Sequence, residues 1–201
     1  RTGLSPDVFD EVLAGCVGQP HDQANLARVI SLRAGLPHST PAYTVARNCA
    51  SGMEAVTSAA TQIMAGRGTT FLCLGVETMS AYPLLLNKKA TDFFGRLAFA
   101  RSAGARLSAI ASWRPSMLAP RIALLEGLTD PTNGMIMGST AELLARDFGL
   151  SREDADTYAT ESHTRAAAAR DAGRFDQEIM PYFPLGASKK QKALVADDSI
   201  R

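Results

Sequence analysis

The sequence predicts an α/β fold built from parallel strands and crossover helices. Residues 41–46 have an extended pattern, the apolar residues from Met53 to Met64 recur at helical spacing, and residues 69–74 form a run typical of a buried strand. Strand, helix and strand in this order make a βαβ unit, in which the strands are parallel and the crossover is right-handed. Hydrophobic residues make up 46% of the chain and aromatic residues only 6%, so small aliphatic side chains would build most of the core.

The elements before this unit follow from the same periodicities. Residues 11–17 form a short apolar run that stops at Gly18, which predicts another strand. A helix should follow and end at Gly35, because three apolar residues then fall at helical spacing: Leu26, Val29 and Ile30.

Two helices are predicted in the last third of the chain. Ser139 with Glu142 has the spacing of a capping box, in which a hydroxyl and an acidic side chain satisfy the first N–H groups of a helix. Ser151 with Asp154 has the same spacing and opens an alanine-rich segment. That second helix should stop at Gly173.

Composition excludes some classes of protein. The net charge of +1 over 201 residues argues against binding to nucleic acid through overall basicity. The apolar runs are much shorter than the ~20 residues that a membrane-spanning helix needs. The three cysteines match no zinc-binding spacing, so we expect free thiols and a reducing, cytoplasmic location. The chain opens at Arg1 without a methionine, and we expect it to be a piece of a longer protein.

The sequence Arg-Asn-Cys-Ala-Ser-Gly at residues 47–52 places Cys49 where a predicted strand ends and a predicted helix begins. The free N–H groups of a helix's first turn, together with its dipole, favour negative charge and therefore a thiolate, which is the nucleophilic form of cysteine. The small residues after Cys49 would let a bulky thioester approach, and the Cys49 N–H could face a developing oxyanion. From these local features alone, a cysteine packed at a tight turn is the competing interpretation.

Four segments in the expected order resemble the thiolase family. They read Asn-Cys-Ala-Ser-Gly-Met-Glu-Ala at residues 48–55, Leu-Cys-Leu-Gly-Val-Glu-Thr-Met-Ser at 72–80 and Met-Gly-Ser-Thr-Ala-Glu at 137–142, and the fourth spans 151–179. The resemblance implies a layered fold with a mixed five-stranded sheet covered by helices, and a helical loop domain. Residues 1–80 would belong to the N-terminal α/β domain and residues 81–201 to the loop domain.

The resemblance also implies a reaction. Cys49 would accept the acyl group in transfer between a 3-ketoacyl-CoA and CoA, in thiolytic cleavage or in the reverse Claisen condensation. Coenzyme A would be a substrate, with no separate cofactor and no metal. Met137 would line the acyl pocket, although a methionine before a helix is also typical of a core. Arg201 would lie against the CoA adenine, although a terminal arginine is more often a solvated chain end.

Two motifs of the family are absent from this sequence: the histidine of a Gly-His-Pro motif and the second cysteine of a Cys-x-Gly-Gly-Gly motif. Both belong to the family's C-terminal half. The opening strand and the closing strands of the family's sheet are also absent from this sequence. We therefore expect the chain to be an incomplete portion that is inactive alone. The alternatives are a ketoacyl-synthase-like condensing enzyme and a non-catalytic fragment that binds acyl-CoA or a partner.

Residues 88–125 form a basic amphipathic insertion. Phe93 with Leu97 and Leu107 with Ile110 have helical spacing, and one acid, Asp92, accompanies a set of basic residues: Lys88, Lys89, Arg96, Arg101, Arg106, Arg114 and Arg121. This pattern is typical of helices that dock on anionic membranes or on partners. It resembles the enlarged loop of fatty-oxidation thiolases, which work beside a hydratase/dehydrogenase subunit. A solvated cover over the CoA site is the alternative, and the resemblance further implies a homodimer or homotetramer.

Overall fold

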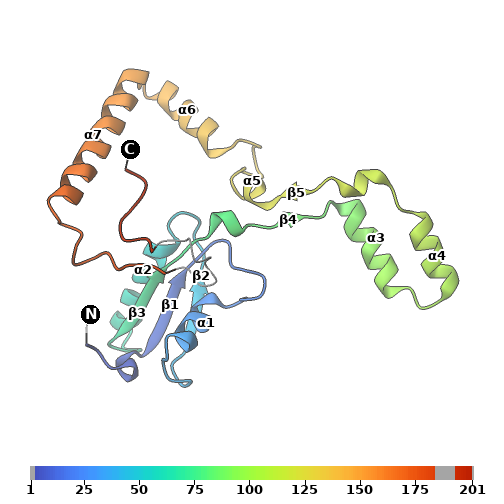
Figure 1. Ribbon diagram of the computed structural model, residues 1–201, viewed down its shortest axis with the longest axis horizontal. Coiled ribbons are helices and arrows are strands. Elements are labelled where there is room, and N and C mark those ends of the chain that lie inside the picture. The colour runs from blue at the N-terminus through green and yellow to red at the C-terminus, as the bar shows by residue number, and fades with distance from the viewer. Residues whose placement is uncertain (1–2, 184–192, 201) are drawn as a thin grey trace. The chain divides into compact units, whose positions relative to one another are not determined.

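The computed structural model describes residues 3–183 and 193–200 (Figure 1). The chain divides into two compact units, Arg1–Thr129 and Asp130–Arg201. The domain boundary expected after residue 80 falls inside the first unit. The division into residues 1–80 and 81–201 stays a prediction.

The first unit contains a parallel sheet of β1 (Glu11–Gly15), β2 (Ala42–Val45) and β3 (Phe71–Gly75) in the order β2-β1-β3. In the register, Leu13 pairs with Tyr43 on one side and with Cys73 on the other. Helix α1 (Leu26–Arg33) connects β1 to β2, and helix α2 (Ser51–Met64) connects β2 to β3. The predicted α/β fold with parallel strands is confirmed.

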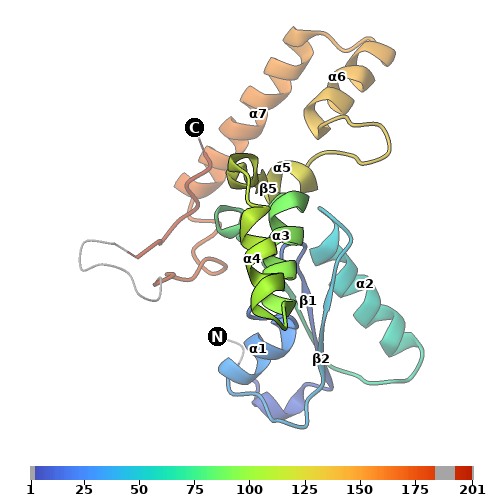
Figure 2. The same cartoon turned by 90° about the vertical axis from the view of Figure 1, so that its right-hand side faces the viewer.

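The core of this unit lies on the central strand. Val12, Leu13 and Ala14 are fully buried, because α1 packs on one face of the sheet and α2 on the other (Figure 2). Leu13 packs against Ala55 and Ala59 of α2, whose small side chains bring the helix close to the strands. The low aromatic content therefore serves a tight helix-on-sheet contact.

The sheet differs from the one that the resemblance implies. A mixed five-stranded sheet was expected, but within residues 3–183 and 193–200 the central sheet has three strands, all parallel. The opening strand and the closing strands of the family have no counterpart in these segments. Antiparallel pairing occurs in a separate two-stranded ladder between β4 (Leu84–Leu85) and β5 (Arg121–Ile122), and in an isolated bridge between Tyr182 and Leu194.

The predicted helices of the basic insertion lie between β4 and β5. They are α3 (Lys88–Phe99) and α4 (Ala103–Ala111), followed by the short turn η3 (Pro115–Leu118). Ala90, Phe93 and Met117 form a small core of their own, with Leu97 packed against it. The helical spacing that placed Phe93 with Leu97 on one helix is confirmed.

Three short elements complete the first unit: η1 (Pro6–Val8), η2 (Met79–Ala81) and α5 (Ala123–Gly127). Among the described residues, no helix is both long enough and apolar enough to cross a membrane.

The second unit contains α6 (Met137–Asp147) and α7 (Arg152–Asp171). The capping box at the start of α7 is confirmed: the Asp154 N–H donates to Ser151 Oγ at 3.1 Å, and the Ser151 N–H donates to Asp154 Oδ2 at 2.9 Å. The box predicted at Ser139 is wrong. Helix α6 already begins at Met137 after the extended N-cap residue Ile136, so Ser139 lies inside its first turn, and no side chain caps the helix.

Candidate functional site

Cys49 lies between the end of β2 at Val45 and the start of α2 at Ser51, and its side chain is exposed. Its neighbour Asn48 has a φ of 46°, in the left-handed region that a non-glycine residue seldom adopts. A sharp turn at Asn48 therefore reverses the chain from strand to helix at the cysteine. The predicted position of Cys49 at a strand-to-helix junction is confirmed.

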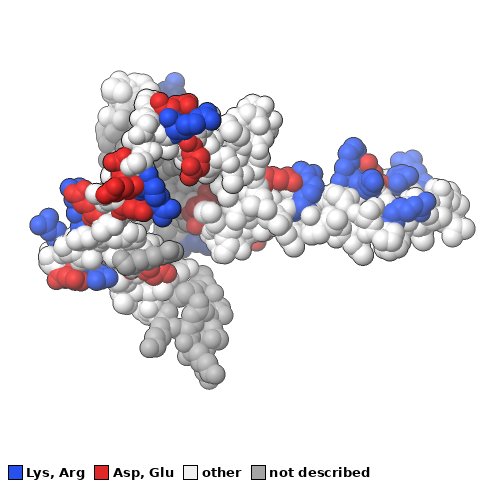
Figure 3. Space-filling model, turned by 90° about the horizontal axis from the view of Figure 1, so that it is seen from above, with Lys and Arg blue, Asp and Glu red and all other residues white. Residues whose placement is uncertain are grey.

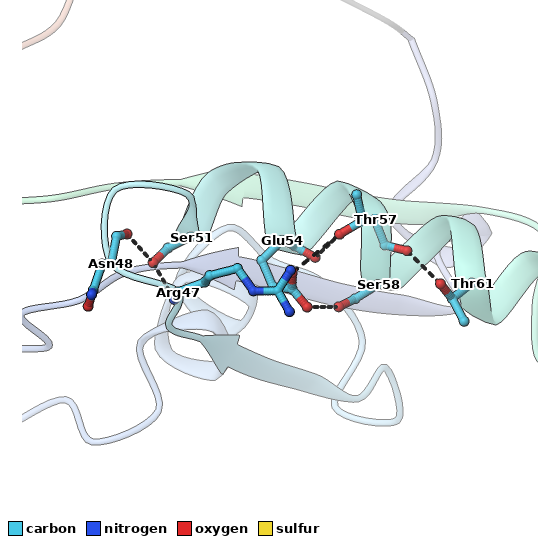
Figure 4. Close-up of polar contacts among 7 residues, drawn as sticks. All are labelled: Arg47, Asn48, Ser51, Glu54, Thr57, Ser58 and Thr61. Atoms are coloured by element: carbon cyan, nitrogen blue, oxygen red, sulfur yellow. Dashed lines mark hydrogen bonds and ion pairs between the residues drawn. The ribbon is translucent and has the colours of Figure 1, made fainter. Parts of the chain in front are cut away.

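Ser51 holds this turn in place. Its buried hydroxyl accepts a hydrogen bond from the Arg47 N–H at 2.8 Å and donates one to the Asn48 carbonyl at 2.7 Å (Figure 4). The Ala50 N–H also donates to the Arg47 carbonyl at 3.0 Å. The sequence interpretation treated Ser51 only as a small residue. A serine three residues after the turn residue Asn48 was the available signal, since serine hydroxyls commonly bond nearby backbone groups.

The first turn of α2 rests directly on the sheet, and glycine at position 15 permits this close approach. A Cβ atom at Gly15 would lie 2.3 Å from the Ser51 carbonyl carbon, which real structures do not tolerate. A Cβ atom at Gly75 would lie 3.5 Å from the Gly52 Cα atom. The carboxyl ends of β1 and β3 thus support the helix start that follows Cys49.

The start of α2 has no side-chain cap. The N-cap residue is Ala50, and the Ser51 N–H donates to the Asn48 carbonyl at 3.1 Å. The N–H groups of a first turn have no partner within the helix, and the helix dipole adds positive potential there. Negative charge on an oxyanion bound beside the helix start is therefore favoured at this position.

Arg47 is tied to the side of α2. Its guanidinium lies 2.7 Å from Glu54 Oε2, and the Glu54 carboxylate also accepts bonds from Ser58 Oγ at 3.3 Å and Thr57 Oγ1 at 3.4 Å (Figure 4). The Arg47 side chain is 68% exposed and that of Glu54 is 21% exposed. Arg47, the basic residue nearest to Cys49 in sequence, is thus paired with a carboxylate of α2.

Glu77 joins the segments that leave β1 and β3. Its carboxylate accepts the Val17 N–H at 2.8 Å and the Gly18 N–H at 3.1 Å, and it receives the Tyr82 hydroxyl at 3.4 Å. These bonds make Glu77 a turn-capping carboxylate. The Cys16 thiol, at 3.9 Å, also points to this carboxylate.

The two other cysteines are poor nucleophiles. Burial raises the pKa of the Cys16 thiol, and the charge of Glu77 raises it further. Burial also raises the pKa of Cys73, whose sulfur packs in the core beside the Ala55 carbonyl at 3.5 Å. Of the three cysteines, Cys49 alone is exposed.

The structure places the other predicted site residues as follows. Met137 begins α6 in the second unit and is 51% exposed. Its place in an acyl pocket stays a prediction. Arg201 lies outside the described residues.

Together, the fold and this site define a class: an α/β protein that presents one exposed cysteine at the uncapped start of a helix. The family model of the thiolase N-terminal domain matches residues 1–201. The chain belongs to the thiolase family.

Relatives of known name agree with this assignment. A probable acetyl-CoA acyltransferase of Staphylococcus aureus (strain COL) is 36% identical over 181 residues, which are 90% of this chain and 41% of the relative. Another, from strain MSSA476, is 35% identical over 198 residues, or 98% of this chain and 45% of the relative. The chain thus spans less than half the length of these relatives.

Solved structures show the same relationship. The acetyl-CoA acetyltransferase of Bacillus anthracis superposes with a TM-score of 0.81 and 33% identity, covering 100% of this chain and 46% of that one. A thiolase of Ascaris suum, solved in complex with coenzyme A, superposes with a TM-score of 0.72 and 27% identity over 89% of this chain and 41% of that one. The described segments therefore have the architecture of a thiolase's N-terminal part.

Proposed function

We propose that this chain is the nucleophile-bearing part of an acyl-CoA acyltransferase of the thiolase type, with Cys49 as the acyl acceptor. The observation that carries the proposal is the position of Cys49, exposed at a sharp turn before an uncapped helix while the other two thiols are shielded. The names of the acyltransferase relatives support the same reaction class.

In the thiolytic direction, the Cys49 thiolate attacks the keto carbon of a 3-ketoacyl-CoA. A carbon–sulfur bond forms, the bond between the α- and β-carbons breaks, and the departing acetyl-CoA carbanion takes a proton. Free CoA then gives up its thiol proton, attacks the thioester and releases the shortened acyl-CoA together with the Cys49 thiolate. Covalent capture divides one difficult step into two easier ones. In this proposal, N–H groups at the start of α2 stabilise the negative charge that develops in both steps.

The proton transfers need an acid and a base that the sequence does not contain in family context. We infer that a Gly-His-Pro histidine and a glycine-flanked cysteine come from the remainder of the complete protein. This chain by itself would then expose Cys49 but would not catalyse acyl transfer. A ketoacyl-synthase-like enzyme or a non-catalytic binding fragment are the competing functions.

The test is acyl-enzyme formation by the complete protein that contains this chain. Incubation with acetyl-CoA should add one acetyl group, found by intact-mass and peptide analysis on Cys49. Cys49→Ser should remove the adduct, whereas Cys16→Ser, a change at a shielded thiol, should leave it. A complete, folded protein that forms no thioester on Cys49 would refute the acyltransferase function.

We further propose a homodimer or homotetramer in the cytoplasm that acts in fatty-acid β-oxidation, because residues 88–125 resemble the enlarged loop of such thiolases. The segment from α3 to η3 is also the part proposed to meet an anionic membrane surface. It exposes Phe94, Phe99 and Leu107 by 53%, 85% and 69%, and Lys and Arg side chains gather over it (Figure 3). A hydratase/dehydrogenase subunit is the alternative occupant of this surface.

A further inference from the structure

Glu77 lies away from the reacting cysteine in sequence, yet its contacts lead back to it. The carboxylate bridges 60 residues of chain by accepting the Val17 N–H at 2.8 Å, and it accepts the Gly18 N–H at 3.1 Å. These donors belong to the segment leaving β1, and Glu77 itself belongs to the segment leaving β3. One carboxylate therefore fastens the exits of two neighbouring strands.

The fastened segment also holds the strand that leads to Cys49. Immediately before Val17, the Cys16 N–H donates to the carbonyl of Val45, the last residue of β2, at 3.0 Å. The turn that contains Cys49 starts two residues later. The position of the end of β2 therefore depends on the segment that Glu77 fixes.

A second route reaches the helix side of the cysteine. The Val76 N–H donates to the Gly15 carbonyl at 3.0 Å, which continues the pairing of β1 with β3 up to Glu77. Gly15 in turn touches the backbone of Ser51 so closely that no Cβ atom would fit. The support under the first turn of α2 is thus anchored by the same carboxylate.

Tyr82 completes the arrangement. Its hydroxyl donates to Glu77 Oε1 at 3.4 Å, and its ring covers Gly18, where an added Cβ atom would lie 2.2 Å from the ring. Both carboxylate oxygens accept hydrogen bonds. An amide in place of the carboxylate would present an NH₂ group to one of these donors.

We infer that Glu77 is a positioning residue for acyl transfer: it locks the exits of β1 and β3 and thereby fixes the turn that presents the Cys49 sulfur beside the start of α2. This inference rests on the proposed function for its catalytic consequence. Its geometric part, the placement of a reactive thiol, does not depend on the acyl substrate. A displaced sulfur would lose both its alignment with the bound acyl group and its position near the start of α2.

The chain contains a matched control at the opposite end of the same two strands. Asp10 Oδ2 accepts the N–H groups of Thr69 at 2.7 Å and Thr70 at 2.9 Å, so it fastens the entries of β1 and β3 as Glu77 fastens their exits. A strand of this length places the two clamps roughly 17 Å apart. Loss of the Asp10 clamp should weaken the fold without moving Cys49.

The experiment compares Glu77→Gln with Asp10→Asn in the complete protein. For Glu77→Gln we expect kcat to fall about tenfold with KM for acetyl-CoA within about twofold of the original, and iodoacetamide to modify Cys49 about fivefold more slowly. Asp10→Asn should leave kcat, KM and the alkylation rate within about twofold of the original. This should hold even if its melting temperature falls as far as that of Glu77→Gln. Tyr82→Phe, which removes one donor and keeps the ring, should show a smaller change in the same direction.

Equal losses in the two clamp variants, or an unchanged rate of Cys49 alkylation in Glu77→Gln, would overturn the inference. Hydrogen exchange of the peptide around Val17 and Gly18 checks that the clamp was opened, since these amides should exchange faster in Glu77→Gln only. If the original protein forms no acyl-enzyme, the proposed function fails, and the alkylation rates still decide the role of Glu77.

Discussion

At the scale of single residues, Cys49 differs from Cys16 and Cys73 in its surroundings as well as in its neighbours in sequence. Cys16 and Cys73 lie within short apolar segments, whereas two polar residues, Arg47 and Asn48, precede Cys49. Cys16 is 2% exposed and faces a carboxylate, whereas Cys49 follows a left-handed turn residue and is open to solvent. Reactivity toward electrophiles should follow this difference, because the thiolate is the attacking form.

Alkylation should therefore be selective. In the complete native protein near neutral pH, iodoacetamide should modify Cys49 at least about tenfold faster than Cys16 or Cys73, whose raised pKa values keep them as thiols. Peptide mass analysis at short times measures the three rates. Unfolding in urea should make the rates similar, and modification of Cys16 before Cys49 in the native protein would contradict the assignment of the nucleophile.

Asp10 supplies a prediction on pH. Hydrogen bonds from the backbone N–H groups of Thr69 and Thr70 hold the pKa of Asp10 below its usual value. A carboxyl group whose pKa is lower in the folded state stabilises the fold above its unfolded pKa, about 4, and this contribution is lost as pH falls through the folded pKa. The melting temperature of Asp10→Asn should lie below the original at pH 7, and the gap should narrow below about pH 4. A gap independent of pH would mean that the charge of Asp10 is not involved.

At the scale of elements, the start of α2 depends on how closely it can approach the strands beneath it. Gly15 belongs to β1, Gly75 belongs to β3, and both face the first turn of the helix. The helix has a buried alanine face against Leu13 further along. Glycine on the strands beneath the first turn lets the helix start approach the sheet closely. Alanine on the helix itself, in the second and third turns, does the same further along.

Replacing Gly15 should show this directly. Gly15→Ala would push a methyl group into the backbone of Ser51, and overpacking of this kind costs about 1–3 kcal/mol of stability. Because the displaced turn carries Cys49, the yield of acyl-enzyme should fall as well. Gly95→Ala in α3, where an added Cβ atom meets nothing within 4 Å, is the control and should be neutral or slightly stabilising. Urea unfolding of both variants provides the measurement, and equal stability would show that the contact can relax.

At the scale of the whole molecule, the described chain combines a parallel sheet unit with segments that have little core of their own. The α3 and α4 segment has a small cluster around Phe93, and the described part of the second unit has no buried residue. Such segments leave large apolar side chains exposed, including Phe99 and Leu118. They are the surfaces on which a partner or a membrane would act.

Vesicle binding tests the membrane proposal for residues 88–125. The complete protein should sediment with anionic vesicles at low salt and much less with neutral ones, since basic residues near a membrane surface each contribute about 1 kcal/mol. Lys89→Glu combined with Arg101→Glu should abolish the preference, whereas Arg146→Glu in α6 should not. Equal sedimentation with both kinds of vesicle would remove the proposal.

The sequence by itself predicted the elements and the candidate nucleophile. Hydrophobic periodicity located the three parallel strands and the helices between them, and the Asn-Cys-Ala-Ser-Gly run placed Cys49 at a junction, because these signals are local to a few residues. It misplaced the start of α6 at Ser139, since the helix already begins at Met137 after the N-cap residue Ile136. Only the tertiary structure decided that Gly15 supports Ser51 and that Glu77 clamps Val17 and Gly18. Those contacts join residues tens of positions apart, and the order of strands in the sheet, which local spacing does not encode, brings them together.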